Sequence, residues 1–211
     1  MTRTIHIVDD DQAFRDSSRS LFSTQSDLVI RCYASGDAFL SQKGEVDPGV
    51  LLLDCYMPGA SGLDVLNAIR DEGHAIIVLT GLGDVGLAVA MMKAGALDFT
   101  GKPCDPQGLL DTVEAAFIGL ERDHAASRRA KNAQARIATL SPREKDVLME
   151  LLKGRSNKAI ASELDLSPRT VEIHRANMLG KLDAGNATEA MRIAYAAGLL
   201  AAEDDLERDG D

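Results

Sequence analysis

The segment VLLLDCYMPGASG, residues 50–62, carries the pattern that decides the fold of the first half of this 211-residue chain. Four consecutive apolar residues, Val50–Leu53, precede Asp54, and a Pro-Gly turn then leads to a helix-like stretch from Gly62. An apolar run without alternation is typical of a strand covered on both faces. The segment therefore predicts a buried strand that ends at a carboxylate.

The same succession of an apolar run and a helix-like stretch occurs five times between residues 1 and 121. The apolar runs are Thr4–Val8, Leu28–Tyr33, Val50–Leu53, Ile76–Leu79 and Ala96–Phe99. The helix-like stretches are Gln12–Thr24, Ser35–Ser41, Gly62–Asp71, Asp84–Lys93 and Pro106–Leu120. Five βα units of this length predict a doubly wound α/β domain built on a parallel sheet.

The remaining residues have a different pattern. Residues 122–139 are rich in Ala and Arg and lack Pro and Gly, so we expect a continuation of the fifth helix or a charged helical linker. A solvated spacer and a helix that mediates dimer contacts both fit that composition. Residues 140–200 show helical patterns only, which predicts an all-α domain of four helices. The acidic tail, residues 201–211, is expected to be disordered.

The net charge of −10 is unevenly distributed along the chain. Residues 1–121 contain 8 Lys and Arg against 18 Asp and Glu, whereas residues 122–202 contain 14 against 9. The last nine residues, 203–211, add 1 basic and 6 acidic residues. The average acidity argues against nucleic-acid binding, but this distribution indicates an acidic module joined to a basic one.

Composition also excludes several classes of protein. No apolar run approaches the roughly 18 residues of a membrane helix, and the start of the chain turns acidic where a signal peptide would be apolar. The spacing of Cys32, Cys55 and Cys104 fits neither a zinc site nor a disulfide framework, and the four histidines are scattered. We therefore expect a soluble, cytoplasmic protein with reduced cysteines.

Polar side chains follow four of the predicted strands. They are the acidic run Asp9–Asp11, Asp54, the pair Thr80–Gly81 and the pair Lys102–Pro103. The carboxyl ends of parallel strands meet at one edge of the sheet, so we expect these groups to converge. Clustered carboxylates suit Mg²⁺, and a hydroxyl with an ammonium suits phosphate oxygens. In isolation each feature would indicate only a helix cap or a turn; together they predict a pocket that accepts a phosphoryl group on a carboxylate.

Residues 1–121 resemble the receiver domain of two-component response regulators. The resemblance rests on IVDDD, LLLDCYMPGASG, IIVLTGLGD and KP, and TGLGDVGLAVAMMKAGALDFTGKP is similar to the FixJ group. The resemblance implies that Asp54 is the phosphoacceptor, that Thr80 is the switch hydroxyl and that Lys102 is the phosphate-binding cation. Phe99 would be the aromatic residue that rotates on activation. The Mg²⁺ ligands would come from Asp9, Asp10, Asp54 and the Tyr56 backbone carbonyl. Asp11 is expected to be a helix cap, and Cys55 and Cys104 are expected to serve packing.

The segment NKAIASELDLSPRTVEIHRANMLGKL, residues 157–182, predicts two helices joined by a short turn. Apolar residues of each helix face a core, which leaves a polar and basic outer face on the second helix. That arrangement fits major-groove recognition, and an ordinary helical bundle with a solvated face is the alternative.

The longer stretch from Leu140 to Leu182 resembles the LuxR-type helix-turn-helix of the NarL/FixJ family, over about residues 138–200. The resemblance implies a DNA interface. Its base-facing residues would be Glu172, Ile173 and Ala176, and its phosphate-facing residues would be Lys158, Arg169, Thr170, Arg175 and Lys181. The fold predicted for the whole chain is thus a (βα)5 receiver domain followed by a four-helix helix-turn-helix domain.

These observations favour a phosphorylation-switched transcription factor. Its partners would be a sensor histidine kinase, promoter DNA, RNA polymerase and a second copy of the chain, and activation is the preferred sign of regulation. We expect no enzymatic activity beyond its own phosphoryl transfer and slow autodephosphorylation. An aspartyl-phosphate phosphohydrolase is an alternative, although Tyr56 stands where it would usually need a second acid. A phosphorylation-independent adaptor is another.

Overall fold

A computed structural model describes residues 3–25, 27–81 and 85–199. The chain forms two compact units, Met1–Asp123 and His124–Asp211. Among the described residues, no helix is both long enough and apolar enough to cross a membrane. The predicted acidic tail, residues 201–211, lies outside the described residues.

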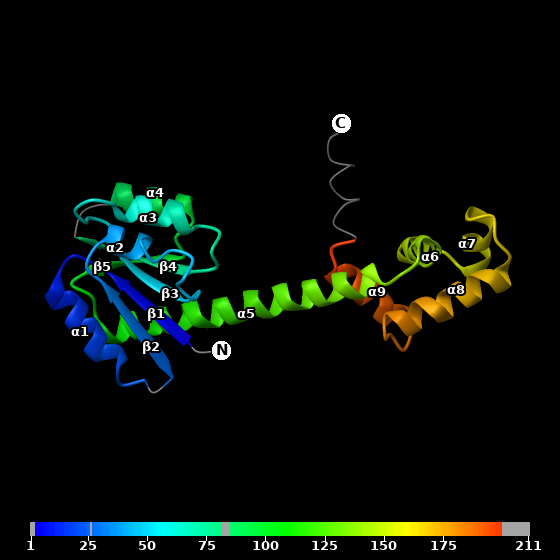
Figure 1. The fold of residues 1–211 in the computed structure, drawn as a ribbon, viewed down its shortest axis with the longest axis horizontal. Coiled ribbons are helices and arrows are strands. Elements are labelled where there is room, and N and C mark those ends of the chain that lie inside the picture. The colour runs from blue at the N-terminus through cyan, green and yellow to red at the C-terminus, as the bar shows by residue number, and fades with distance from the viewer. Residues whose placement is uncertain (1–2, 26, 82–84, 200–211) are drawn as a thin grey trace. The chain divides into compact units, whose positions relative to one another are not determined.

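The first unit is a five-stranded parallel sheet flanked by helices (Figure 1). The strands are β1 (Arg3–Val8), β2 (Leu28–Tyr33), β3 (Val50–Asp54), β4 (Ala75–Gly81) and β5 (Asp98–Lys102). The helices that follow them are α1 (Gln12–Phe22), α2 (Gly36–Leu40), α3 (Gly62–Ile69), α4 (Val85–Ala94) and α5 (Pro106–Ala138). The strand order β2-β1-β3-β4-β5 confirms the predicted doubly wound α/β fold.

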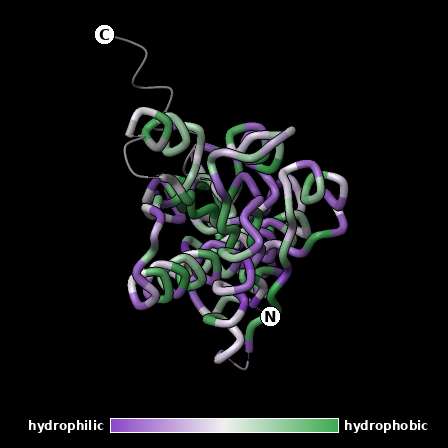
Figure 2. The backbone as a smooth tube through the Cα atoms, turned by 90° about the vertical axis from the view of Figure 1, so that its left-hand side faces the viewer, coloured by the Kyte–Doolittle hydropathy of each residue, from purple (hydrophilic) through white to green (hydrophobic). Residues whose placement is uncertain are grey.

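Helices cover both faces of the sheet, and β3 shows why its sequence does not alternate. Leu51 and Leu53 pack into the core beneath α2, α3 and α4, whereas Val50 and Leu52 pack into the core beneath α1 and α5. Every residue of β3 is therefore buried, as a strand with two covered faces requires. Figure 2 colours the backbone by hydropathy and shows hydrophobic (green) segments interleaved with hydrophilic (purple) ones.

The predicted boundaries of the fifth strand, Ala96–Phe99, are wrong, because β5 begins at Asp98. Gly95 has a φ of +112° and ends α4, and the Ala96 N–H then bonds to the Met91 carbonyl. This helix-ending turn uses Ala96, and the next residue, Leu97, donates its N–H to the Ile76 carbonyl of β4 just before β5 begins. Lys102 is consequently the last residue of β5, and Thr80 and Gly81 likewise lie within β4.

As far as residue 199, where its described part ends, the second unit contains four helices after α5: α6 (Pro142–Leu152), α7 (Asn157–Glu163), α8 (Pro168–Lys181) and α9 (Ala187–Ala196). Apolar residues from all four helices form its core, including Val147, Ile160, Val171, Met178 and Ala190. Each helix begins at a side-chain cap, and the caps are Ser141, Ser156, Ser167 and Asn186. The short turn between α7 and α8 gives the predicted helix-turn-helix.

Helix α5 contributes to the cores of both units. Leu109, Val113 and Phe117 are buried in the first unit, and Ala133 and Ile137 are buried in the second. Residues 122–138 are therefore helical, and their last turns pack against the second core.

Candidate functional site

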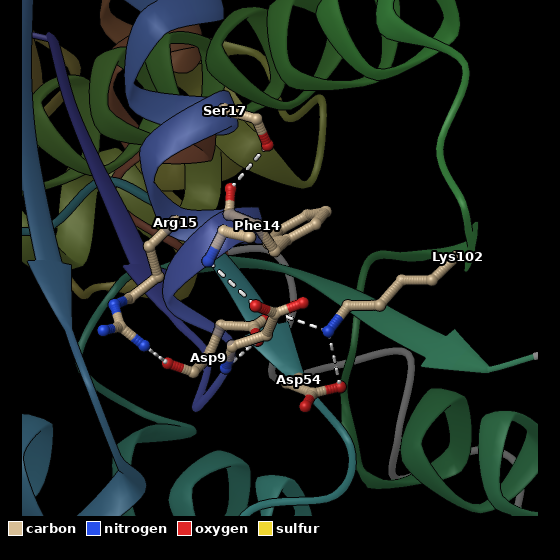
Figure 3. Close-up of polar contacts among 8 residues, drawn as sticks. Asp9, Phe14, Arg15, Ser17, Asp54 and Lys102 are labelled. Atoms are coloured by element: carbon tan, nitrogen blue, oxygen red, sulfur yellow. Dashed lines mark hydrogen bonds and ion pairs between the residues drawn. The ribbon is translucent and has the colours of Figure 1, made fainter.

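The carboxyl ends of β1, β3 and β5 bring three charged side chains together (Figure 3). Lys102 Nζ lies 2.6 Å from Asp9 Oδ2 and 3.2 Å from Asp54 Oδ1. Asp9 is 0% exposed and Asp54 is 7% exposed, so one ammonium pairs with two buried carboxylates and balances the charge of only one. The predicted convergence of strand-end residues is present at these three positions.

Backbone contacts fix the acidic run after β1. Asp9 Oδ1 accepts the Asp11 N–H at 2.9 Å, and the Asp9 carbonyl accepts a hydrogen bond from Arg15 at 2.7 Å. Asp11 Oδ1 accepts the Ala13 N–H at 2.8 Å, which confirms that Asp11 is the N-cap of α1. The buried carboxylate of Asp9 thus has a defined orientation before any ligand binds.

Lys102 is held from one further side by Phe14, whose ring centroid lies 4.7 Å from Nζ. Burial lowers the pKa of Lys102, but hydrogen bonds and charge from Asp9 and Asp54 more than offset this, so its pKa lies above the ordinary value. The side chain is therefore a permanent cation directed at Asp54.

Asp10 completes a cluster of carboxylates with Asp9 and Asp54. One oxygen from each of the three lies within 4.8 Å of the others, and only Asp10 is solvent-exposed. Burial raises the pKa of Asp54, an effect that Lys102 counteracts and that the charge of Asp9 reinforces. Three hard oxygen donors with one side open to solvent fit Mg²⁺, which usually retains several water ligands.

Thr80 is buried near the end of β4, beside the end of β3. The Cys55 N–H bonds to the Leu79 carbonyl, and Thr80 pairs with Gly101, one residue before Lys102. The Thr80 hydroxyl donates to the Gly81 carbonyl at 3.3 Å. The sheet register therefore places this hydroxyl at the same edge as Asp54 and Lys102.

Two residues that the resemblance implicates are exposed. Phe99 is 52% exposed on β5, and Tyr56 is 60% exposed after β3. The sequence also places Leu82, with Tyr56, close to where water would attack the phosphoryl group, and Leu82 lies outside the described residues. No disulfide joins the cysteines of the described chain, and Cys55 packs with its Sγ 3.5 Å from Met91 Sδ.

Sequence reasoning missed Phe14 and Arg15, which position Lys102 and Asp9. The missed signal is their spacing. Asp11 caps α1, so residues 14 and 15 lie in the first turn, directly behind the acidic run. That spacing places both residues near the acidic run, but the contact of Phe14 with Lys102 requires the tertiary structure.

In the second unit, the outer face of α8 divides into exposed residues and residues with intramolecular partners. Arg169, Glu172, Ile173 and Ala176 are exposed, as is Lys158 on α7. Ile173 is 54% exposed on this face.

The other predicted phosphate contacts have partners within the unit. Arg175 donates to Asn157 Oδ1, and the Thr170 hydroxyl pairs with the Ser167 hydroxyl at 2.8 Å. Lys181 Nζ lies 2.7 Å from Glu144 Oε2, a carboxylate that also accepts the Ser141 N–H. Lys181 is thus engaged in joining α8 to the start of α6, which a sequence pattern could not reveal.

Comparison with known proteins matches both units. Residues 5–114 match the response regulator receiver domain, and residues 138–194 match the bacterial regulatory proteins of the luxR family. The chain belongs to the response regulators. This response regulator joins a receiver domain to a LuxR-type DNA-binding domain, as its sequence predicts.

Relatives match this response regulator over almost its whole length. It is 41% identical to the transcriptional regulatory protein FixJ of Rhizobium meliloti (strain 1021) over 197 residues, which cover 92% of this chain and 96% of that protein. It is 39% identical to the C4-dicarboxylate transport transcriptional regulatory protein DctR of Rhodobacter capsulatus, covering 92% and 100%.

Solved structures show the same architecture. The response regulator StyR matches with a TM-score of 0.79 at 29% identity, over 92% of this chain and 99% of StyR. Full-length FixJ from B. japonicum matches with a TM-score of 0.59 at 37% identity, over 94% and 98%. The fold and the two-domain organisation are therefore those of a transcriptional response regulator.

Proposed function

We propose that a sensor histidine kinase phosphorylates Asp54 and that this modification promotes dimerisation and sequence-specific DNA binding. The observation that carries the proposal is the buried ion pair of Lys102 with both Asp9 and Asp54. A cation fixed beside a nearly buried carboxylate is an arrangement that can accept and hold a phosphoryl group.

In the proposed transfer, an oxygen of Asp54 bonds to phosphorus while the phosphorus–nitrogen bond to the kinase histidine breaks. Asp54 gains negative charge, and Lys102 turns from the carboxylates toward the new phosphoryl oxygens. Asp9, Asp10, Asp54 and the Tyr56 carbonyl would hold Mg²⁺, which when bound would neutralise charge as the phosphoryl group arrives. Asp9 needs no reorientation, because the Asp11 N–H already fixes its carboxylate.

The proposed switch follows from where Thr80 and Phe99 lie. Among the described residues, the Thr80 hydroxyl gives up one 3.3 Å bond to Gly81, and the phosphoryl oxygens are stronger acceptors. Movement of Thr80 vacates space beside β5, into which the exposed Phe99 ring turns. The surface of α4, β5 and the start of α5 changes with it and forms the dimer contact.

Dimerisation would present two copies of α8 to two half-sites of promoter DNA. Arg169 and Lys158 would contact phosphates, and Glu172, Ile173 and Ala176 would face bases. Joining two weak contacts raises the affinity through effective concentration. Activation of transcription, through contact with RNA polymerase, is the preferred outcome on promoters.

We also propose that the protein does not turn over an external phosphate ester. Tyr56 supports this, because the position offers a phenol where a phosphohydrolase would use an acid. The proposed activity is a single transfer to Asp54 followed by slow hydrolysis.

The test compares Asp54→Asn with Asp11→Asn in the full chain. Both changes remove one carboxylate, but the asparagine that replaces Asp11 would still cap α1. Acetyl phosphate with Mg²⁺ should label the wild type and Asp11→Asn stoichiometrically and leave Asp54→Asn unlabelled. Beryllofluoride should make the wild type dimeric in sedimentation. Label on Asp54→Asn, or dimerisation independent of beryllofluoride, would contradict the proposal.

A further inference from the structure

A groove in the second unit lies between the last turns of α5 and the helix α9. It has a volume of about 350 Å³, and Ala133 and Ile193 are buried at its base. Its lining includes three arginines, Arg129, Arg136 and Arg192. The groove is separate from the outer face of α8 on which the proposed DNA contacts lie.

The charge of the groove is only partly balanced. Arg136 donates to the Leu182 and Asp183 carbonyls. The carboxylate of Glu189, which also lines the groove, accepts the Gly185 N–H at 2.9 Å. Within the part of the chain that the structure describes, Arg129 and Arg192 have no ion pair or side-chain hydrogen bond. Two exposed guanidinium groups therefore remain to bind an anionic partner.

The chain itself supplies an anionic segment close by. Gln134 Nε2 lies 3.4 Å from the Ala197 carbonyl, so the chain leaves α9 alongside α5. Ala196 lines the groove, and the acidic sequence EDDLERDGD, residues 203–211, begins seven residues later. Seven residues can span up to about 25 Å, whereas the groove-lining stretch of α9 is about 10 Å long. Residues 203–211 can therefore reach both arginines.

We propose that the acidic C-terminal segment, residues 203–211, binds in this groove through carboxylate pairs with Arg129 and Arg192. The segment carries 6 acidic residues and 1 basic residue, which complements the groove. Because it is tethered within a few residues of the site, its effective concentration is high enough for weak, salt-sensitive pairs to form.

The binding of this segment has a consequence that rests on the proposed DNA-binding function. Arg136 connects the groove to the carboxyl end of α8, since it bonds to the carbonyls that follow that helix. An acidic segment held there repels DNA phosphates and lowers DNA affinity, most strongly at low salt. The tail then acts as an intramolecular competitor of DNA.

The first experiment measures binding of the tail without DNA. The arginine Nε–H resonances of the full chain are compared with those of a tail-neutral variant, E203Q/D204N/D205N/E207Q/D209N/D211N. The Arg129 and Arg192 resonances should differ between the two proteins at low salt and converge as salt is added, while those of Arg122 and Arg128 should not. Identical Arg129 and Arg192 resonances in both proteins would overturn the proposal, whether or not the protein binds DNA.

The second experiment measures affinity for a mixed-sequence DNA duplex at low salt. The tail-neutral variant should bind roughly threefold to tenfold more tightly than the wild type. This gain should disappear in an Arg129→Gln/Arg192→Gln background and persist in the matched Arg122→Gln/Arg128→Gln control. If the gain of the tail-neutral variant instead persists in the Arg129→Gln/Arg192→Gln background, the tail does not act through this groove and the proposal is wrong.

Discussion

Lys102 depends on Phe14 as well as on its two carboxylates. The ring 4.7 Å from Nζ stabilises the ammonium in the position from which it reaches Asp54. A partly buried cation–π contact contributes about 1 kcal/mol. We expect Phe14→Leu to slow acetyl phosphate labelling of Asp54 about fivefold, and Phe14→Tyr, which keeps the ring, to label at the wild-type rate. Equal rates for Phe14→Leu and the wild type would exclude this role.

His6 is a buried base that the proposed chemistry does not use. Its Nε2 donates to the Asp47 backbone carbonyl at 3.0 Å, and its ring packs against Tyr33, Phe39 and His74. Burial lowers the pKa of His6 to about 4, and the charges of His74 and Arg31 act in the same direction. The ring is therefore neutral in the folded protein at neutral pH.

Because the folded pKa lies below the ordinary value of 6.5, acid favours the unfolded chain. The contribution of His6 to stability is complete above pH 6.5 and falls by about 3 kcal/mol as the pH approaches 4. His6→Gln keeps a polar group but cannot titrate. Its urea midpoint, followed by circular dichroism, should vary less than that of the wild type over this interval. Parallel pH profiles would show that other groups control the acid sensitivity.

At the scale of elements, the sequence predicts most accurately the buried strands that consist of a continuous apolar run. The runs Val50–Leu53 and Ile76–Leu79 are wholly apolar, and they predict the ends of β3 and β4 to within two residues. β5 was misplaced because it is an edge strand with polar residues, and its start depends on the turn at Gly95. Strand-end chemistry identified Asp9, Asp54 and Lys102, but contacts across the chain, such as Lys102 with Phe14, require the tertiary structure.

Lys181 was predicted to contact DNA phosphate, but in the structure it forms an ion pair with Glu144. Substitution of Lys181 can show whether its role is structural. Burial raises the pKa of Glu144, but the donors Lys181 and Ser141 outweigh it, so its pKa lies below the ordinary value. Lys181→Met would leave the buried carboxylate without its cation and should lower the stability of the second unit by about 1–3 kcal/mol. Chemical denaturation measures this loss, and Glu144→Gln/Lys181→Met should recover part of it.

The salt dependence of DNA binding separates Lys181 from Arg169. Each phosphate contact contributes about 0.9 to the slope of log affinity against log salt concentration. Arg169→Gln should therefore reduce the slope by about that amount. Lys181→Met should leave the slope unchanged under conditions in which the protein remains folded. A reduced slope for Lys181→Met would mean that the lysine exchanges Glu144 for a phosphate when DNA binds.

At the scale of the whole molecule, α5 belongs to both units, and the boundary between them is a position along one helix. The charge and composition of residues 122–139 predicted a helix but not which of its residues pack. The structure shows that Ala133 and Ile137 are the residues that pack, because they are buried in the core of the second unit. Their small number and weak periodicity made them indistinguishable from a solvated spacer in the sequence.

A fragment of residues 124–202 should therefore be more stable than one of residues 140–202. The shorter fragment loses the buried Ile137 and Ala133 side chains and exposes the core they cover, which costs roughly 2–4 kcal/mol. It also loses the bonds from Arg136 to the carbonyls after α8. Urea denaturation of the two fragments measures the difference. In the longer fragment, Ile137→Ala should account for most of it, whereas Ala126→Ser, at an exposed position of the same helix, should not. Equal stabilities would place the boundary of the second unit at its own first helix, α6.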